Sequence, residues 1–251
     1  MEQQASTPRR LYTLAGVAGI MVGVFVLSFA FVATGAGIAF APEVHEGGSI
    51  AYWIDNVVAN PGLWKVAMFC ITVGFGSMFV SGFAWFNILG PERWQKYVSL
   101  SGYVIGIPMA ITTFMDYHAL MQQIAVTQQG GVVPESLALQ ANLSVESWWL
   151  VSSLYGPSFV VVLGTGFLSW SLLKEERLPD WLCYWGMACG VMFILYLFHG
   201  YVPFLEVFST GAGPLHMLWF AVMGIVTLRN RSAAVPTTME RGSVVASSRA
   251  T

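Results

Sequence analysis

The histidines and acidic residues that could bind a ligand or carry a proton lie near one end of the apolar segments that contain them. The stretch TTFMDYHALMQQ at 112–123 places Asp116 and His118 at the end of a long apolar run. On a helix that turns about 100° per residue, these two side chains point about 200° apart, so they do not form a two-residue ligand. Each therefore needs a partner from another segment.

A later apolar run supplies candidate partners. Tyr196, His199 and Glu206 recur at i, i+3 and i+10 along one helical face, and His216 follows the short sequence GAGP. All four histidines of the chain, including His45, fall in the outer half of the topology argued below or outside the membrane. We expect a shared, outward-opening polar pocket. Its candidate ligand or proton-site residues are Asp116, His118, Tyr196, His199, Glu206 and His216.

Several kinds of chemistry remain open for such a pocket. It could bind a polar ligand, relay protons, hold a metal or axially ligate a haem, with His118, His199 and His216 as the ligands. An ionisable group within hydrocarbon costs about 2.5–3.5 kcal/mol on insertion scales, which favours a buried partner. The alternative is that each group reaches headgroups or water. The sequence has no H-E-x-x-H motif and no histidine pair at i, i+4, so a metal or haem is not favoured.

The composition identifies the elements that must position these residues. Of the 251 residues, 56% are hydrophobic and 10% are charged, and the mean hydropathy is +0.65. A soluble domain is about 25% charged, so these values predict a polytopic α-helical membrane protein. Pro108 and Pro157 predict kinks in two of its helices. Apolar runs long enough to span the hydrocarbon core predict six transmembrane helices at about 12–40, 62–89, 98–124, 147–173, 181–205 and 213–228.

The distribution of charge predicts the orientation. The tails and the connections 90–97 and 174–180 carry all the basic residues except Lys65, whereas 41–61, 125–146 and 206–212 carry none. By the positive-inside rule, we expect a multi-pass protein of the inner (plasma) membrane with both termini in the cytoplasm. Residues 1–231 then form one six-helix domain, and 232–251 form a disordered cytoplasmic tail.

A spacing recurs at the start of every odd-numbered helix. An arginine is followed after eight residues by glycine, and after three more by a second glycine. Such glycine pairs allow a neighbouring helix to approach closely. Two interpretations stay open: the chain is three tandem helical hairpins, or the spacing is a coincidence in a glycine-rich sequence. The glycines concerned are Gly19, Gly23, Gly102, Gly106, Gly186 and Gly190.

The segment 156–195 resembles an uncharacterised bacterial family of six-helix integral membrane proteins. The likeness lies in a glycine-rich helix, a short basic turn that ends in Leu178-Pro179 and an aromatic-leucine pair, and a second glycine-rich helix. The N-terminal RRLYTLAGVAGI is similar in style. The resemblance implies six helices in a bacterial membrane, and it implies no reaction.

Together these observations predict a non-catalytic membrane protein, either an accessory subunit or a ligand-binding module that uses the outer pocket. A small proton- or cation-coupled transporter, with Asp116 and Glu206 as its ion sites, is the first alternative. A haem- or metal-binding redox protein is the second. The expected partners are membrane lipid and other membrane subunits, and no nucleic acid is expected.

Overall fold

The computed structural model describes residues 2–35, 56–57, 59–128, 156, 158–198 and 201–230, and every element in these ranges is a helix. The α-helices are joined by one π-helical segment and one short 3-10 helix. In chain order the elements are α1 (Glu2–Gly35), α3 (Pro61–Ile88), α4 (Trp94–Gln128), the π-helix η3 (Ser158–Gly166), α6 (Phe167–Lys174), α7 (Asp180–Leu197), the 3-10 helix η4 (Pro203–Glu206) and α8 (Val207–Asn230).

Three helical segments are long and apolar enough to cross a membrane, namely Arg9–Gly35, Pro61–Ile88 and Asp180–Leu197. The continuous helix Ser158–Lys174, formed by η3 and α6, is apolar but shorter. Large apolar side chains point outward from these helices, and Phe31 is 78% exposed. Such faces suit contact with lipid tails rather than water. The three long apolar helices therefore indicate insertion into a membrane.

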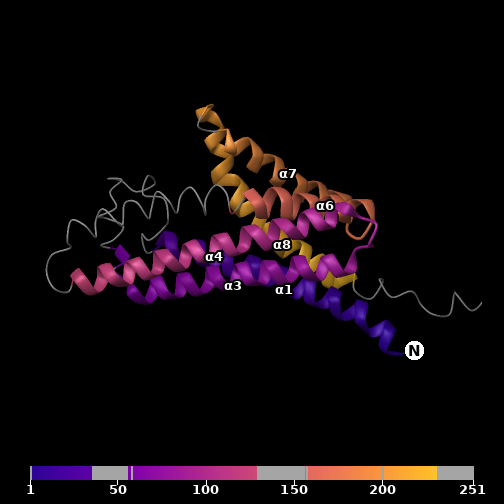
Figure 1. Ribbon diagram of the computed structural model, residues 1–251, viewed down its shortest axis with the longest axis horizontal. Helices are drawn as coiled ribbons and strands as arrows, with labels where there is room; N and C mark the ends of the chain where they lie inside the picture. Colours follow the sequence, from indigo (N-terminus) through magenta and orange to yellow (C-terminus); the bar gives the residue numbers. More distant parts are fainter. Residues whose placement is uncertain are drawn as a thin grey trace, which may run out of the picture.

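The helices form a closed ring. Each one packs against the next in chain order, and α8 at the end of the chain packs back against α1. The continuous η3–α6 helix lies between α4 and α7, so those two helices are not neighbours in the ring. Away from the end that carries the N-terminus, α7 and α8 turn away from α3 and α4 (Figure 1).

The centre of the ring is filled by large side chains. Tyr103 of α4 is fully buried, and its ring lies against the backbone of Gly82 in α3 and of Gly164 in η3. It also meets the ring of Phe220 from α8 at a centroid distance of 6.5 Å. A single side chain thus contacts three other helices, because the glycines leave room for it. Other large side chains that are fully buried include Trp64, Trp85, Met78, Leu168, Leu172 and Trp219.

Short connections join the helices at one end of the ring. Residues 89–93 link α3 to α4, and residues 175–179 link α6 to α7. The second connection needs a left-handed residue, Glu176, whose φ is 53°. Proline marks the start of two helices: Pro61 is the first residue of α3, and Pro179 directly precedes α7. At the start of a helix the missing backbone N–H of proline costs no hydrogen bond within the helix.

The helix boundaries differ from the predicted spans in several places. α1 begins at Glu2, whereas the predicted span begins at 12, and α4 runs from Trp94 to Gln128, whereas the predicted span is 98–124. α7 ends at Leu197, whereas the apolar run predicts a helix to 205, and α8 begins at Val207, whereas the run predicts a start at 213. Residues 207–212, which the predicted topology assigns to a loop, are therefore helical. α4 continues through Pro108. Where Pro157 predicts a kink, a π-helix begins at the next residue, and Pro157 itself lies outside the described residues.

Candidate functional site

His216 is the one histidine whose side chain the described part of the chain includes, and it is fully buried. It lies in α8, where its ring stacks on Trp219 at 6.5 Å and meets the edge of Phe220 at 5.1 Å between centroids. The sequence predicts that this residue faces an outward-opening pocket. The structure instead places it in the interior of the ring, and its hydrogen bond runs to the π-helix.

A chain of side-chain hydrogen bonds starts at this histidine. Nε2 of His216 lies 2.7 Å from Oγ1 of Thr165 in η3, and that oxygen lies 3.1 Å from the hydroxyl of Tyr103 in α4. All three side chains are fully buried. The chain therefore ties three helices together within the apolar core, where unsatisfied polar groups are costly.

The chain can run in two directions, because the two hydroxyls and a neutral imidazole supply three protons for two hydrogen bonds. In one direction Nε2 of His216 donates to Thr165 and Thr165 donates to Tyr103, which leaves the Tyr103 proton without an acceptor in the chain. In the other, Tyr103 donates to Thr165, Thr165 donates to Nε2 of His216, and the imidazole proton lies on Nδ1. That atom has no hydrogen-bond partner among the described residues.

A second buried polar group lies one helical turn from Thr165. The hydroxyl of Ser169 in α6 is fully buried and has no partner among the residues that the structure describes. It packs against Gly186 of α7, and a Cβ at Gly186 would collide with it and lie 2.8 Å from the indole of Trp219. Trp219 donates its Nε1–H to the carbonyl of Leu182 at 2.7 Å. Two unpaired polar atoms, Nδ1 of His216 and Oγ of Ser169, thus belong to the buried region around the stacked His216–Trp219 pair.

The π-helix supports this site. The hydroxyl of Ser99 donates to the carbonyl of Gly164 at 2.6 Å, and Gly102, one turn further along α4, lies directly against the backbone of Gly164 and Phe159. The wider π turn leaves backbone carbonyls less regularly paired than an α-helix does, and π turns are frequent at functional sites. The π-helix presents Thr165 to both α4 and α8.

Most glycines of the pairs lie at close helix contacts. A Cβ at Gly19 would lie 2.8 Å from the carbonyl oxygen of Phe220 in α8, and one at Gly106 would lie 2.7 Å from that of Gly156. Gly23 lies against Ala221 of α8, whereas Gly190 makes looser contacts with η3, at 3.6 Å or more. Each glycine pair therefore packs against the fourth or the sixth of the predicted spans.

The other predicted site residues have different positions. Tyr196 of α7 is buried in a small apolar cluster with Val161, Cys189 and Phe193, and its ring meets that of Phe193 at 5.6 Å. α4 carries Asp116 and His118, and the η3–α6 helix separates α4 from α7. The side chains of Asp116, His118 and Glu206, and the whole of His199, lie outside the described residues.

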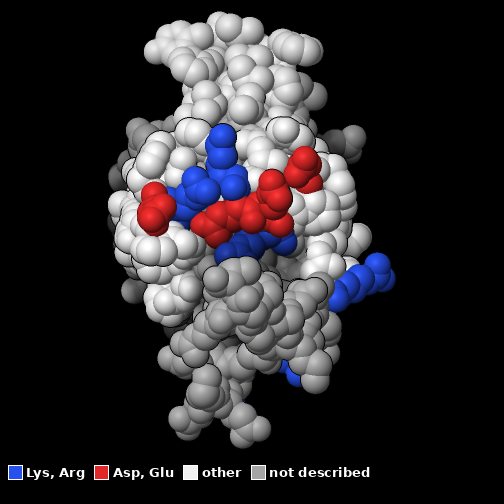
Figure 2. Space-filling model, turned by 90° about the vertical axis from the view of Figure 1, so that its right-hand side faces the viewer, with Lys and Arg blue, Asp and Glu red and all other residues white. Residues whose placement is uncertain are grey.

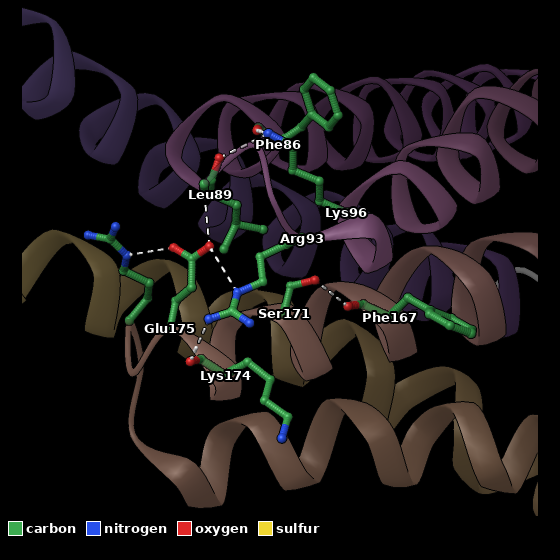
Figure 3. Close-up of polar contacts among 10 residues, drawn as sticks. Phe86, Leu89, Arg93, Lys96, Phe167, Ser171, Lys174 and Glu175 are labelled. Carbon is green, nitrogen blue, oxygen red and sulfur yellow. Dashed lines mark hydrogen bonds and ion pairs between the residues drawn. The ribbon is translucent and has the colours of Figure 1, made fainter.

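Charged residues form a second polar region at the end of the ring with the short connections, which we call the charged end. Lysines, arginines and acids gather in the middle of this end (Figure 2). Glu175 organises them: it accepts from the backbone N–H of Gly90 at 2.8 Å, and it pairs with Arg177 at 3.2 Å and with Arg93 at 3.8 Å (Figure 3). This carboxylate therefore joins the two short connections.

Lys96 stabilises the end of α3 at the same place. Only 7% of this residue is exposed, and its ammonium group donates to the carbonyls of Leu89 at 3.0 Å and Phe86 at 3.3 Å. It also lies 4.5 Å from the centroid of the Phe86 ring. A cation that satisfies the last carbonyls of a helix complements the helix dipole.

Several residues of the buried site are missing from the sequence-based candidates. Tyr103, Thr165, Ser99 and Ser169 were not among them, because a hydroxyl within an apolar run has many roles. The available signal was that Thr165 and Ser169 are spaced i, i+4 within a largely apolar segment.

No group of three or more His, Cys, Asp or Glu residues that could hold a metal occurs among the described residues. Among the imidazole nitrogens that the structure describes, Nδ1 of His216 is the one left for a ligand.

Comparison with protein-family models, with curated proteins and with solved structures gives no match to this chain.

Proposed function

We propose that this protein is a six-span inner-membrane protein with both termini in the cytoplasm. The ring supports this proposal, because α4 and α8 run alongside helices that are long and apolar enough to span a membrane. The charged end supports the orientation, since both short connections carry basic residues there. Three tandem hairpins are consistent with glycine pairs that each pack against an even-numbered span.

Labelling of introduced cysteines tests the topology. Glu92→Cys should react with an impermeant thiol reagent only from the cytoplasmic side, and Glu135→Cys only from outside. The native cysteines Cys70, Cys183 and Cys189 are buried, so they should give little background. Labelling of both introduced cysteines from one side would contradict six spans.

The function that the geometry supports best is a non-catalytic ligand-binding or accessory module. One observation carries it: the centre of the ring is packed with Tyr103, Trp219, Phe220 and His216, all fully buried. Protein interiors are typically packed as densely as organic crystals, and a centre filled by large buried side chains favours a packed module over a channel. The partners of such a module are lipid and other membrane subunits.

Purification in mild detergent with cross-linking tests this function. An accessory or binding module should capture a membrane protein in a fixed ratio or a small polar molecule, and it should give proteoliposomes no flux above protein-free vesicles. An absorbance spectrum and elemental analysis belong to the same experiment. A Soret band or a stoichiometric metal would replace the proposal with a redox protein.

A small proton-coupled transporter is the second candidate. It is favoured by the two buried atoms without partners among the described residues, Nδ1 of His216 and Oγ of Ser169. Proton flux into vesicles that enclose a pH-sensitive dye would distinguish the two functions. Flux that is present in the wild type and absent in a well-folded His216→Gln variant would establish transport.

A further inference from the structure

We propose that α4 and α6 form a binding site for an anionic phospholipid at the charged end, where Lys174 and Arg93 contact the lipid phosphate. The proposal requires only that the helices lie in a membrane. It holds whether the protein is an accessory module or a transporter, so its failure would leave the proposed function unchanged.

An aromatic surface forms the apolar part of this site. Phe167 and Trp170 are three residues apart on α6, and Trp94 of α4 meets them edge-on at 5.8 Å and 5.6 Å between centroids. Trp94 is 54% exposed, so the cluster opens to the outside of the ring. Tryptophan in such a position lies at the boundary between acyl chains and headgroups.

Two cations lie close to this surface along the chain. Lys174 follows Trp170 at i+4, so its side chain extends from the same face of α6. Arg93 immediately precedes Trp94, and its Nη2 donates to the carbonyl of Lys174 at 3.5 Å. This hydrogen bond holds the ends of the two helices together, so both cations lie at the end of the helices that carry the aromatic rings.

Lys174 remains available to a ligand. Its ammonium group points away from Glu175 and contacts none of the residues drawn with it (Figure 3). The carboxylate of Glu175 is engaged by Gly90, Arg93 and Arg177. Lys174 is exposed and forms no ion pair with the described residues.

The aromatic rings and the two basic side chains together favour a lipid over free phosphate. Cations near a membrane surface attract anionic headgroups, and an exposed aromatic surface close to them suits acyl chains but not an inorganic ion. Phosphatidylcholine carries the same phosphate beside a choline cation, which the two basic side chains would repel. The expected preference is therefore for a phospholipid with net negative charge, such as phosphatidylglycerol.

Native mass spectrometry of the detergent-purified protein tests the site. Phosphatidylglycerol and phosphatidylcholine with the same acyl chains are added separately, and the bound lipid is counted. The wild type should retain about fivefold more phosphatidylglycerol, and Lys174→Gln should remove most of that preference, since one basic residue near an anionic surface contributes about 1 kcal/mol. Lys174→Arg should retain it.

Matched controls identify the outcomes that overturn the proposal. Lys65→Gln removes an exposed lysine at the start of α3 and should leave the preference unchanged. Equal retention of the two lipids by the wild type would refute the site, and so would an undiminished preference in Lys174→Gln. Displacement of the lipid by excess inorganic phosphate would show a phosphate site instead.

Discussion

The buried chain of Tyr103, Thr165 and His216 and the network around Glu175 both join helices through polar atoms, but in opposite surroundings. In the chain, one hydrogen bond joins each two neighbouring side chains. All three side chains are fully buried, so a group that loses its partner is not exposed to bulk water. At the charged end, Glu175 has three partners, and the Arg93 and Arg177 side chains are each 40% exposed. The interior should therefore be sensitive to small changes, and the charged end should tolerate them.

The largest effect is expected where the interior has no free space. Gly102→Ala should lower Tm in detergent by about 10 °C, because the new methyl group would meet the backbone of Gly164 and Phe159, which cannot move aside. Gly76→Ala is the matched control within a helix, since its Cβ would meet nothing within 4 Å. Equal Tm values for the two variants would show that the ring is loosely packed.

Thr165→Val tests the buried chain. It removes the hydroxyl between His216 and Tyr103 at nearly constant volume, and it should cost about 1.5–2 kcal/mol because two buried groups lose a partner. That exceeds the average of about 0.6 kcal/mol for hydrogen bonds between membrane helices. Thr72→Val is the control, because Thr72 bonds only to Met68 of its own helix. Addition of Tyr103→Phe should cost little more, and full additivity would mean that the three groups act independently.

Lys96→Met tests an intermediate case, a buried cation at the charged end. Loss of the hydrogen bonds to Leu89 and Phe86 should destabilise the protein by about 1 kcal/mol, since the last turn of α3 loses its cap. Thermal unfolding of Lys96→Met beside the exposed-site variant Lys65→Met gives the comparison. A stabilised Lys96→Met would indicate that desolvation of the ammonium outweighs its contacts.

Glu175→Gln should have the smallest effect, about 0.5 kcal/mol at low salt. The amide can still accept from the N–H of Gly90, so only the attraction to the two arginines is lost. The difference from wild type should shrink in 1 M salt, where the Debye length is about 3 Å. A loss of several kcal/mol that salt does not change would place Glu175 with the buried chain rather than with an exposed network.

The hydropathy of the sequence predicted the ends of some helices closely and misplaced others. α3 begins at Pro61 and ends at Ile88, against a predicted 62–89, because proline and a glycine-proline turn mark its ends. The start of α8 was misplaced because Gly211 and Gly213 suggest a loop, yet both belong to the helix. Within a membrane, glycine in a helix is common, since the absence of water favours intrahelical hydrogen bonds.

The site could be predicted only in part. His216 was among the candidates because all four histidines of the chain fall in the outer half of the predicted topology or outside the membrane. Its partners could not be identified, because helical periodicity gives the faces of one helix and not which faces meet. Thr165 also lies in a π-helix, where the residues that share a face differ from those of an α-helix.

The closed ring also has a consequence for chain connectivity. Because α8 packs against α1 and both of their terminal ends lie toward the charged end, the order in which the helices are synthesised is not needed to define their neighbours (Figure 1). A circular permutant that joins the termini through a flexible linker and opens the chain within 89–93 would keep every helix beside its present neighbours. Its new ends would then separate α3 from α4 in sequence, while Tyr103 would still meet Thr165 and Phe220 at the centre.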